Sequence, residues 1–169
     1  MKPQMAESYI QYGGEGTISN RALSELLQAV LDKGMPFRFR APGFSMSPFI
    51  RDGDVITISR LSGDSPGQGT VVAFSQPKTG KLIVHRVVVK KAGYIMIKGD
   101  NTPCADCFVP QANVLGYVNK VERNGKHVFI GLGPERFLIA FLSRKQLLVP
   151  LLRPLAVLLR PFVRLRRAS

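Results

Sequence analysis

The sequence has no tryptophan, two cysteines, two histidines and 11 acidic residues in a total of 169. Without tryptophan and with only four tyrosines, any platforms for stacking on bases would have to come from phenylalanine, which disfavours nucleic acid as a partner. No stretch reaches the roughly 18 uninterrupted apolar residues of a membrane-spanning helix. Residues 1–16 are polar and lack the apolar centre of a secretory signal. We therefore expect a protein that is cytoplasmic or peripheral on the membrane.

The two cysteines lie together in Cys104-Ala105-Asp106-Cys107. A closed zinc site needs four ligands, and two thiols without a nearby histidine do not supply them. A redox thiolate usually sits at a helix N-terminus, whereas this segment is predicted to be a loop between strands. The sequence therefore predicts no metal and no cofactor, and it leaves the role of Cys104 and Cys107 open.

The net charge is +13, and its distribution is uneven. Residues 136–169 hold eight Lys/Arg and no acid, interleaved with Leu, Val, Phe and Pro. This pattern suits an anionic membrane surface at least as well as a phosphate backbone. A basic tail that packs on its own domain or on a protein partner is the alternative. Because proline breaks helices, Pro150, Pro154 and Pro161 predict a tail of two or three short, kinked helical pieces.

The apolar pattern predicts one helix followed by many short strands. Leucines and a valine recur on one face from about Asn20 to Lys33, and Gly34 follows as a helix end. After Pro36 the chain favours an antiparallel, coiled and partly barrel-like sheet. We expect an N-terminal segment at 1–35, a β-rich domain at 36–133 and a helical tail at 134–169. Strands are expected at 37–40, 55–59, 70–74, 82–90, 94–98, 114–122 and 127–130, with a hairpin at Asn124-Gly125.

Three segments carry candidates for serine acylation chemistry, which needs a nucleophile, a base and a group that orients the base. Ser45 follows Gly43 in a turn, where backbone N–H groups can approach an oxyanion. His85 lies in the middle of a predicted strand and is the candidate base. Asp100 and Asp106 lie in a later loop, and either carboxylate is a candidate for orienting the histidine.

These segments match a known pattern. Gly43-Phe44-Ser45-Met46-Ser47-Pro48, followed by Gly53-Asp54, resembles the nucleophile box of the signal peptidase I and LexA-type serine peptidases. Most of these enzymes use a lysine base, but the endoplasmic-reticulum and archaeal signal peptidases have a histidine in a strand similar to Ile83-Val84-His85-Arg86-Val87. The same branch has a box similar to Lys98-Gly99-Asp100-Asn101-Thr102, with an aspartate several residues on, here Asp106.

The resemblance implies a mainly β peptidase fold and cleavage of an extended leader or signal-like peptide lying along a strand edge. By position, Ser45 is the nucleophile, in preference to Ser47, and His85 the general base. Asp106 is the orienting acid and Asp100 supports it or shapes the loop. Gly43, Ser45 and Met46 are expected to bind the oxyanion or the substrate.

Two departures from the pattern keep other functions open. The N-terminal spanning helix of signal peptidases is replaced by an amphipathic helix, and Gly43 stands where many bacterial members have a hydroxyl residue. A self-processing or partner-sensing LexA-like regulatory peptidase is therefore one alternative. A non-catalytic basic β-domain that binds anionic membranes or nucleic acid is the other.

Overall fold

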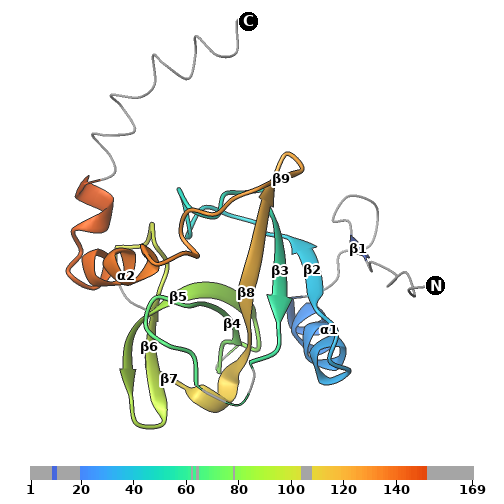
Figure 1. The fold of residues 1–169 in the computed structure, drawn as a ribbon. Helices are drawn as coiled ribbons and strands as arrows, with labels where there is room; N and C mark the ends of the chain where they lie inside the picture. The colour runs from blue at the N-terminus through green and yellow to red at the C-terminus, as the bar shows by residue number, and fades with distance from the viewer. Residues whose placement is uncertain are drawn as a thin grey trace, which may run out of the picture.

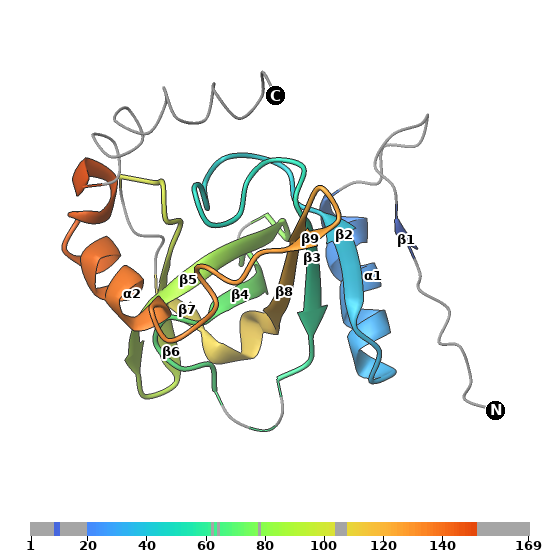
Figure 2. The same cartoon turned by 45° about the horizontal axis from the view of Figure 1, so that its top comes forward.

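The computed structural model describes residues 9–10, 20–61, 63, 65–77, 79–103 and 108–151. Figure 1 shows a sheet with one helix on each side, α1 on the right and α2 on the left of the view. Both views in Figures 1 and 2 place these helices at opposite sides of the molecule. The elements are β1 (Tyr9–Ile10), α1 (Asn20–Asp32), β2 (Phe37–Arg40), β3 (Val55–Ser59), β4 (Val71–Ser75), β5 (Leu82–Lys91), β6 (Tyr94–Lys98), β7 (Phe108–Pro110), the 3-10 helix η1 (Gln111–Asn113), β8 (Val114–Arg123), β9 (Lys126–His127) and α2 (Arg136–Arg144).

The strands form one sheet in the order β1-β2-β3-β8-β4-β5-β6-β7, and β9 pairs with β8. All neighbours are antiparallel except β1 and β2, which run parallel. The sheet is not closed, since no described strand joins β1 to β7. The mainly β, antiparallel fold expected from the sequence is thus confirmed.

Strand β5 has a half-paired segment that matters for the site. β4 pairs with β5 along Leu82–Arg86, and β6 pairs with β5 only from Arg86 onward. Among the described strands, the segment 82–84 therefore pairs with β4 alone. Its other edge faces away from β4 and can take an added strand.

The core consists of two apolar clusters on the two faces of β4. Val71 and Ala73 face one cluster and Val72 and Phe74 the other, as the two-residue period of a strand requires. The leucine stripe of α1 packs in the first cluster, which confirms the predicted amphipathic helix. Its end is also as expected, because Gly34 has φ +74° and its N–H donates to the Leu31 carbonyl.

The strand predictions fail mainly at short elements. The strand expected at 127–130 is only β9, Lys126–His127, although the Asn124-Gly125 turn has the expected positive φ angles. The sequence did not predict β1 or β7, which have two and three residues and carry little pattern of their own. The tail begins with α2 and a second helical turn at 148–151. Its continuation, with Pro154 and Pro161, lies outside the described residues.

The described helices are short. None of them combines the length and the apolar character that crossing a bilayer requires.

Candidate active site

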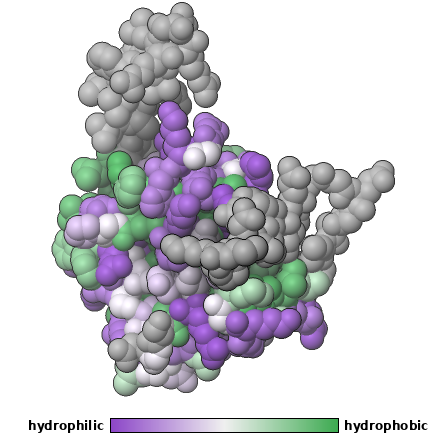
Figure 3. All heavy atoms as spheres, turned by 45° about the vertical axis from the view of Figure 1, so that its right-hand side comes forward, coloured by the Kyte–Doolittle hydropathy of each residue, from purple (hydrophilic) through white to green (hydrophobic). Residues whose placement is uncertain are grey.

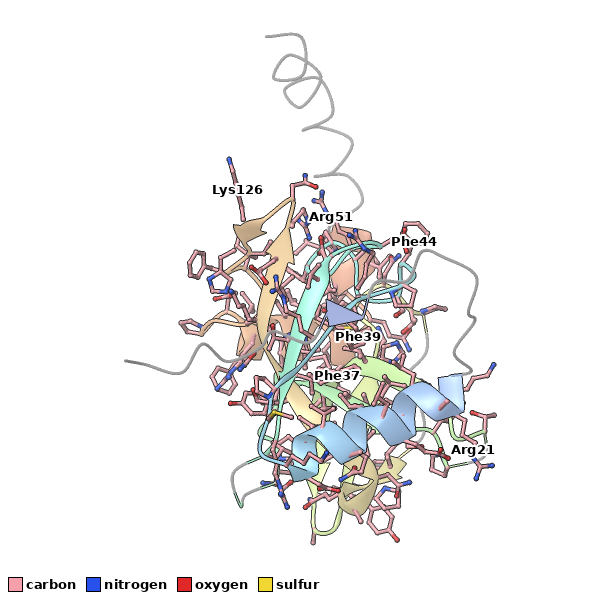
Figure 4. All side chains as sticks on the ribbon, turned by 90° about the vertical axis from the view of Figure 1, so that its right-hand side faces the viewer. Arg21, Phe37, Phe39, Phe44, Arg51 and Lys126 are labelled. Atoms are coloured by element: carbon pink, nitrogen blue, oxygen red, sulfur yellow. The ribbon has the colours of Figure 1, made fainter. Side chains whose placement is uncertain are left out.

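The loop between β2 and β3 carries Ser45 and is held by the core at its base. Met46 and Ile50 are buried in the first apolar cluster, and the Ile50 N–H donates to the Met46 carbonyl. Gly43 has φ +89°, a conformation that suits glycine. Figure 4 shows Phe44 and Arg51 beyond the end of β2 that carries Phe39, so the loop extends past the strand. The local sequence thus presents Ser45 on a turn with a buried anchor directly after it.

His85 reaches the same place from the middle of β5. It is buried, and its strand partner is Val72 on β4. Gly99 lies directly against both candidate residues: a Cβ atom on Gly99 would be 2.8 Å from the Ser45 carbonyl oxygen and 2.9 Å from Nε2 of His85. The structure therefore brings the Ser45 backbone and the His85 imidazole together at Gly99, the second residue of the Lys98–Thr102 box.

A cleft of about 580 Å³ lies between the Ser45 loop and β5. Figure 2 shows this loop, in teal between β2 and β3, extending over β5. Ser45 and His85 both line the cleft, and so does the half-paired segment of β5. The other lining residues are mostly apolar, and the full set is Leu23, Phe39, Arg40, Ala41, Pro42, Gly43, Ser45, Met46, Ile50, Asp52, Gly53, Leu82, Ile83, Val84 and His85.

The loop after β6 supports the nucleophile segment through its backbone. The Asn101 N–H donates to the Ser45 carbonyl at 2.7 Å, and the Asn101 side-chain amide donates to the Phe44 carbonyl at 3.2 Å. Thr102 Oγ1 donates to the Gly99 carbonyl at 2.9 Å and closes the turn. The third sequence box therefore holds the Ser45 backbone in place, a contact that sequence reasoning did not foresee.

Asp100 is bound to Arg86 by two hydrogen bonds. Nε and Nη2 of Arg86 donate to Oδ1 and Oδ2 of Asp100 at 2.8 and 2.7 Å, and both side chains are fully buried. Nη1 donates to the carbonyls of Gly69 and Gly131, and the guanidinium lies 5.6 Å from the Phe49 ring. Because neighbouring strand residues project to opposite faces, Arg86 lies on the face opposite His85. In this arrangement Asp100 positions the 99–102 loop.

A second Arg–Asp pair holds the other end of the Ser45 loop. Nε and Nη2 of Arg123 donate to Oδ1 and Oδ2 of Asp54 at 2.9 and 2.7 Å. Nη2 also donates to the Phe49 carbonyl, and the Arg51 N–H donates to Asp54. Burial acts to raise the pKa of Asp54, but the hydrogen bonds from Arg123 and Arg51 outweigh it and lower that pKa below its usual value.

The candidate oxyanion residue Gly43 has its amide engaged. The Gly43 N–H donates to Oδ1 of Asp52 at 2.8 Å, so this donor turns toward a side chain of the loop. A developing oxyanion would compete with that carboxylate for the same proton. The role predicted for Gly43 stays a prediction, with Asp52 as the group that must give way.

The remaining candidates have different positions. Asp106, Cys104 and Cys107 lie outside the described residues. Ser47 is half-buried in the Ser45 loop and does not line the cleft. The other histidine, His127 in β9, lies against Phe129 with the two ring centroids 4.2 Å apart and the rings tilted by 53°. The described residues contain no group of three or more His, Cys, Asp or Glu placed to hold a metal ion.

Sequence reasoning missed Arg86, Asn101 and Lys98 as site residues. Arg86 carried a signal, because an arginine inside a valine-rich strand must find a buried carboxylate. Lys98 is also buried, and its Nζ donates to Ser143 Oγ of α2 at 3.3 Å and to the Gly99 carbonyl at 3.5 Å. Arg86 and Lys98 bind the 99–102 loop, and Asn101 joins this loop to the Ser45 loop.

The family model described as Peptidase S24-like matches residues 9–122, a range that contains Ser45, His85 and Asp100. The match confirms the resemblance to the LexA and signal peptidase group at the level of this family. Comparison with curated protein sequences gives no match.

Proposed function

Because this chain belongs to the Peptidase S24-like family, a family of serine peptidases, we propose that it is an endopeptidase with Ser45 as nucleophile and His85 as general base. The observation that carries the proposal is that Ser45 and His85 line one cleft and meet at Gly99. A serine needs an adjacent base to become nucleophilic, and His85 is the titratable imidazole in the cleft.

The proposed reaction is acyl transfer to Ser45 followed by hydrolysis. Oγ of Ser45 attacks the scissile carbonyl as its proton passes to Nε2 of His85, and the resulting imidazolium then protonates the leaving amine. Water hydrolyses the acyl-enzyme with His85 again as base. Asp106 is the proposed acid that holds the His85 tautomer, because both oxygens of Asp100 accept hydrogen bonds from Arg86.

The proposed substrate is an extended peptide of the leader or signal type. Residues 82–84 offer a strand edge directly before His85, and backbone pairing along this edge would place the scissile bond next to Ser45. The mostly apolar walls of the cleft favour small or apolar side chains in the substrate. A dedicated peptidase for one leader-bearing partner fits this arrangement.

Two substitutions with matched controls test the catalytic roles. Ser45→Ala and His85→Ala should each lower turnover on the order of 10³-fold or more, as in other serine triads. Ser47→Ala, in the same loop, and His127→Ala, the other histidine, should leave turnover close to native. The measurement is a comparison of protein N-termini in cells that carry each variant, followed by cleavage assays on the substrate so identified. N-termini that persist in both Ser45→Ala and His85→Ala cells would overturn the proposal.

Self-processing is a second candidate, and the position of β1 favours it. Tyr9–Ile10 pairs in parallel with β2, and β2 residues Phe39 and Arg40 line the cleft. The backbone of β1 therefore lies one strand away from the cleft. Intact mass after long incubation distinguishes the candidates: self-processing predicts a shortened chain from the native protein and a full-length chain from Ser45→Ala.

A further inference from the structure

Helix α2 turns an apolar face to the outside of the molecule. Its inner side buries Ile139, Ala140 and Ser143. Phe137, Leu138 and Phe141 are on the other side and are more than half exposed. A helix on the surface of a globular protein normally turns charged and polar residues outward, so this outer side needs a partner.

The same character continues after the helix. Leu147 and Leu151 are 52% and 61% exposed. Figure 3 shows apolar (green) atoms gathered at the left edge of the view, the side on which Figure 1 places α2. We refer to Phe137, Leu138, Phe141, Leu147 and Leu151 as the α2 apolar face.

Cations border this face and acids are absent from its sequence. Arg144 and Lys145 are exposed at the end of α2, and residues 136–169 contain no Asp or Glu. The neighbouring carboxylate, Glu135, accepts hydrogen bonds from the N–H groups of Gly131 and Gly133. The Gly131 hydrogen bond is the main reason that its pKa is lowered. Glu135 is thus bound to its own loop.

We propose that the α2 apolar face docks on the anionic surface of a lipid bilayer. Aromatic and leucine side chains bordered by Lys and Arg are the features of interfacial helices, which bury their apolar side at the boundary of headgroups and acyl chains. Each cation near such a surface adds about 1 kcal/mol of attraction. This proposal is independent of the peptidase activity.

Charge selects the bilayer over other occupants of this face. A second copy of this chain would bring the same basic border, within a net charge of +13, against its own. Residues 152–169 are basic and lack acids as well. Nucleic acid would satisfy the cations but would leave five large apolar side chains exposed.

The packing of α2 makes this face a fixed part of the molecule. α2 contacts β5, and its Ser143 accepts a hydrogen bond from the buried Lys98. Because β5 also carries His85, docking through α2 would hold the cleft at a set position relative to the bilayer. Peptides that leave or enter the membrane surface would then be the ones presented to the cleft.

Vesicle binding by the full chain tests the proposal. We expect the native protein to bind phosphatidylcholine vesicles containing phosphatidylglycerol much more strongly than pure phosphatidylcholine vesicles. Phe137→Ser combined with Phe141→Ser should weaken that binding about tenfold or more, since two aromatic anchors are lost. Arg144→Glu combined with Lys145→Glu should weaken it at least about 30-fold.

Two controls separate the outcomes. Phe108→Ser, which changes an exposed phenylalanine on β7, should bind vesicles as the native chain does. Ser45→Ala should also bind as native, so that a failed peptidase hypothesis leaves this result intact. Native-like vesicle binding by the Phe137/Phe141 variant would overturn the proposal, as would equal binding to neutral vesicles. A native dimer in sedimentation that this variant dissociates would assign the face to a second copy instead.

Discussion

The dipeptides Gly53-Asp54 and Gly99-Asp100 each bind an arginine near the Ser45 loop, and the two ion pairs differ in how deeply they are buried. Asp54 pairs with Arg123 and Asp100 pairs with Arg86, both through two hydrogen bonds. The Arg86–Asp100 side chains are 0% exposed, whereas Arg123 is 25% exposed. Asp100 is followed by Asn101, which holds the Ser45 carbonyl, and Asp54 ends the Ser45 loop at β3. The fully buried Arg86–Asp100 pair thus supports the loop that contacts Ser45, whereas the partly exposed Arg123–Asp54 pair holds the end of the Ser45 loop.

The largest expected change in stability comes from removing one partner of the buried Arg86–Asp100 pair. Arg86→Met removes the cation and leaves Asp100 buried without it, which should lower the free energy of unfolding by about 3–5 kcal/mol. Urea unfolding followed by circular dichroism measures this change. Combining Arg86→Met with Asp100→Leu should recover much of the stability, since no charge is left buried. If Arg86→Met alone were as stable as the native chain, the Arg86–Asp100 pair would not be the more important of the two ion pairs.

Substitutions at the two glycines, Gly99 and Gly53, should affect different properties, cleavage in the first case and stability in the second. A Cβ atom on Gly99 would meet Ser45, His85 and Thr102 at 2.8–2.9 Å, whereas one on Gly53 has Arg40 Nη1 at 3.7 Å as its nearest contact. Gly99→Ala should therefore lower kcat/KM about 10²-fold by displacing the reacting groups. Gly53→Ala, at φ +83°, should cost about 1–2 kcal/mol of stability and leave cleavage close to native. Equal losses of cleavage in both variants would show that the contact of Gly99 with Ser45 and His85 is not what cleavage depends on.

Much of the fold, and the pairing of Ser45 with His85, was predictable from short-range patterns in the sequence. The leucine stripe of α1, the β-branched run of β3 and the valine-rich run of β5 are local signals, and the structure has these elements within one or two residues of the expected bounds. The three boxes also predicted that Ser45 and His85 belong to one site, and the structure places both on one cleft.

The ion pairs were not predictable in the same way. Asp54 and Asp100 each follow a glycine and have the pattern of turn formers, which is how such residues are usually interpreted. Their arginine partners lie 69 and 14 positions away along the chain. Which arginine meets which aspartate depends on the register of β8 with β3 and of β5 with β6, and both registers contain a shift. Register shifts of this kind have no signature in one sequence.

The shallow pair should give a smaller change than the deep one. Asp54→Asn removes the carboxylate that binds Arg123 and the Arg51 N–H, at an expected cost of about 1–3 kcal/mol. Urea unfolding at neutral pH measures it beside Arg86→Met. Cleavage should fall only modestly, because Met46 and Ile50 still anchor the loop in the core. A loss of stability larger than that of Arg86→Met would reverse the order of the two pairs.

The smallest expected effect is the loss of the stability contributed by the Asp54–Arg123 pair at low pH. The folded-state pKa of Asp54 is lowered below its usual 3.8, because the hydrogen bonds from Arg123 and Arg51 outweigh the effect of burial. The folded state therefore binds the proton of Asp54 less readily than the unfolded state does, and stability falls as the pH falls. The contribution is complete above the usual pKa and is lost as the pH falls through the lowered one. Urea unfolding of the native chain and of Asp54→Asn at a series of pH values should thus show a difference that is constant near neutrality and shrinks in acid. A difference that stays the same at every pH would mean that the Asp54 carboxylate does not supply it.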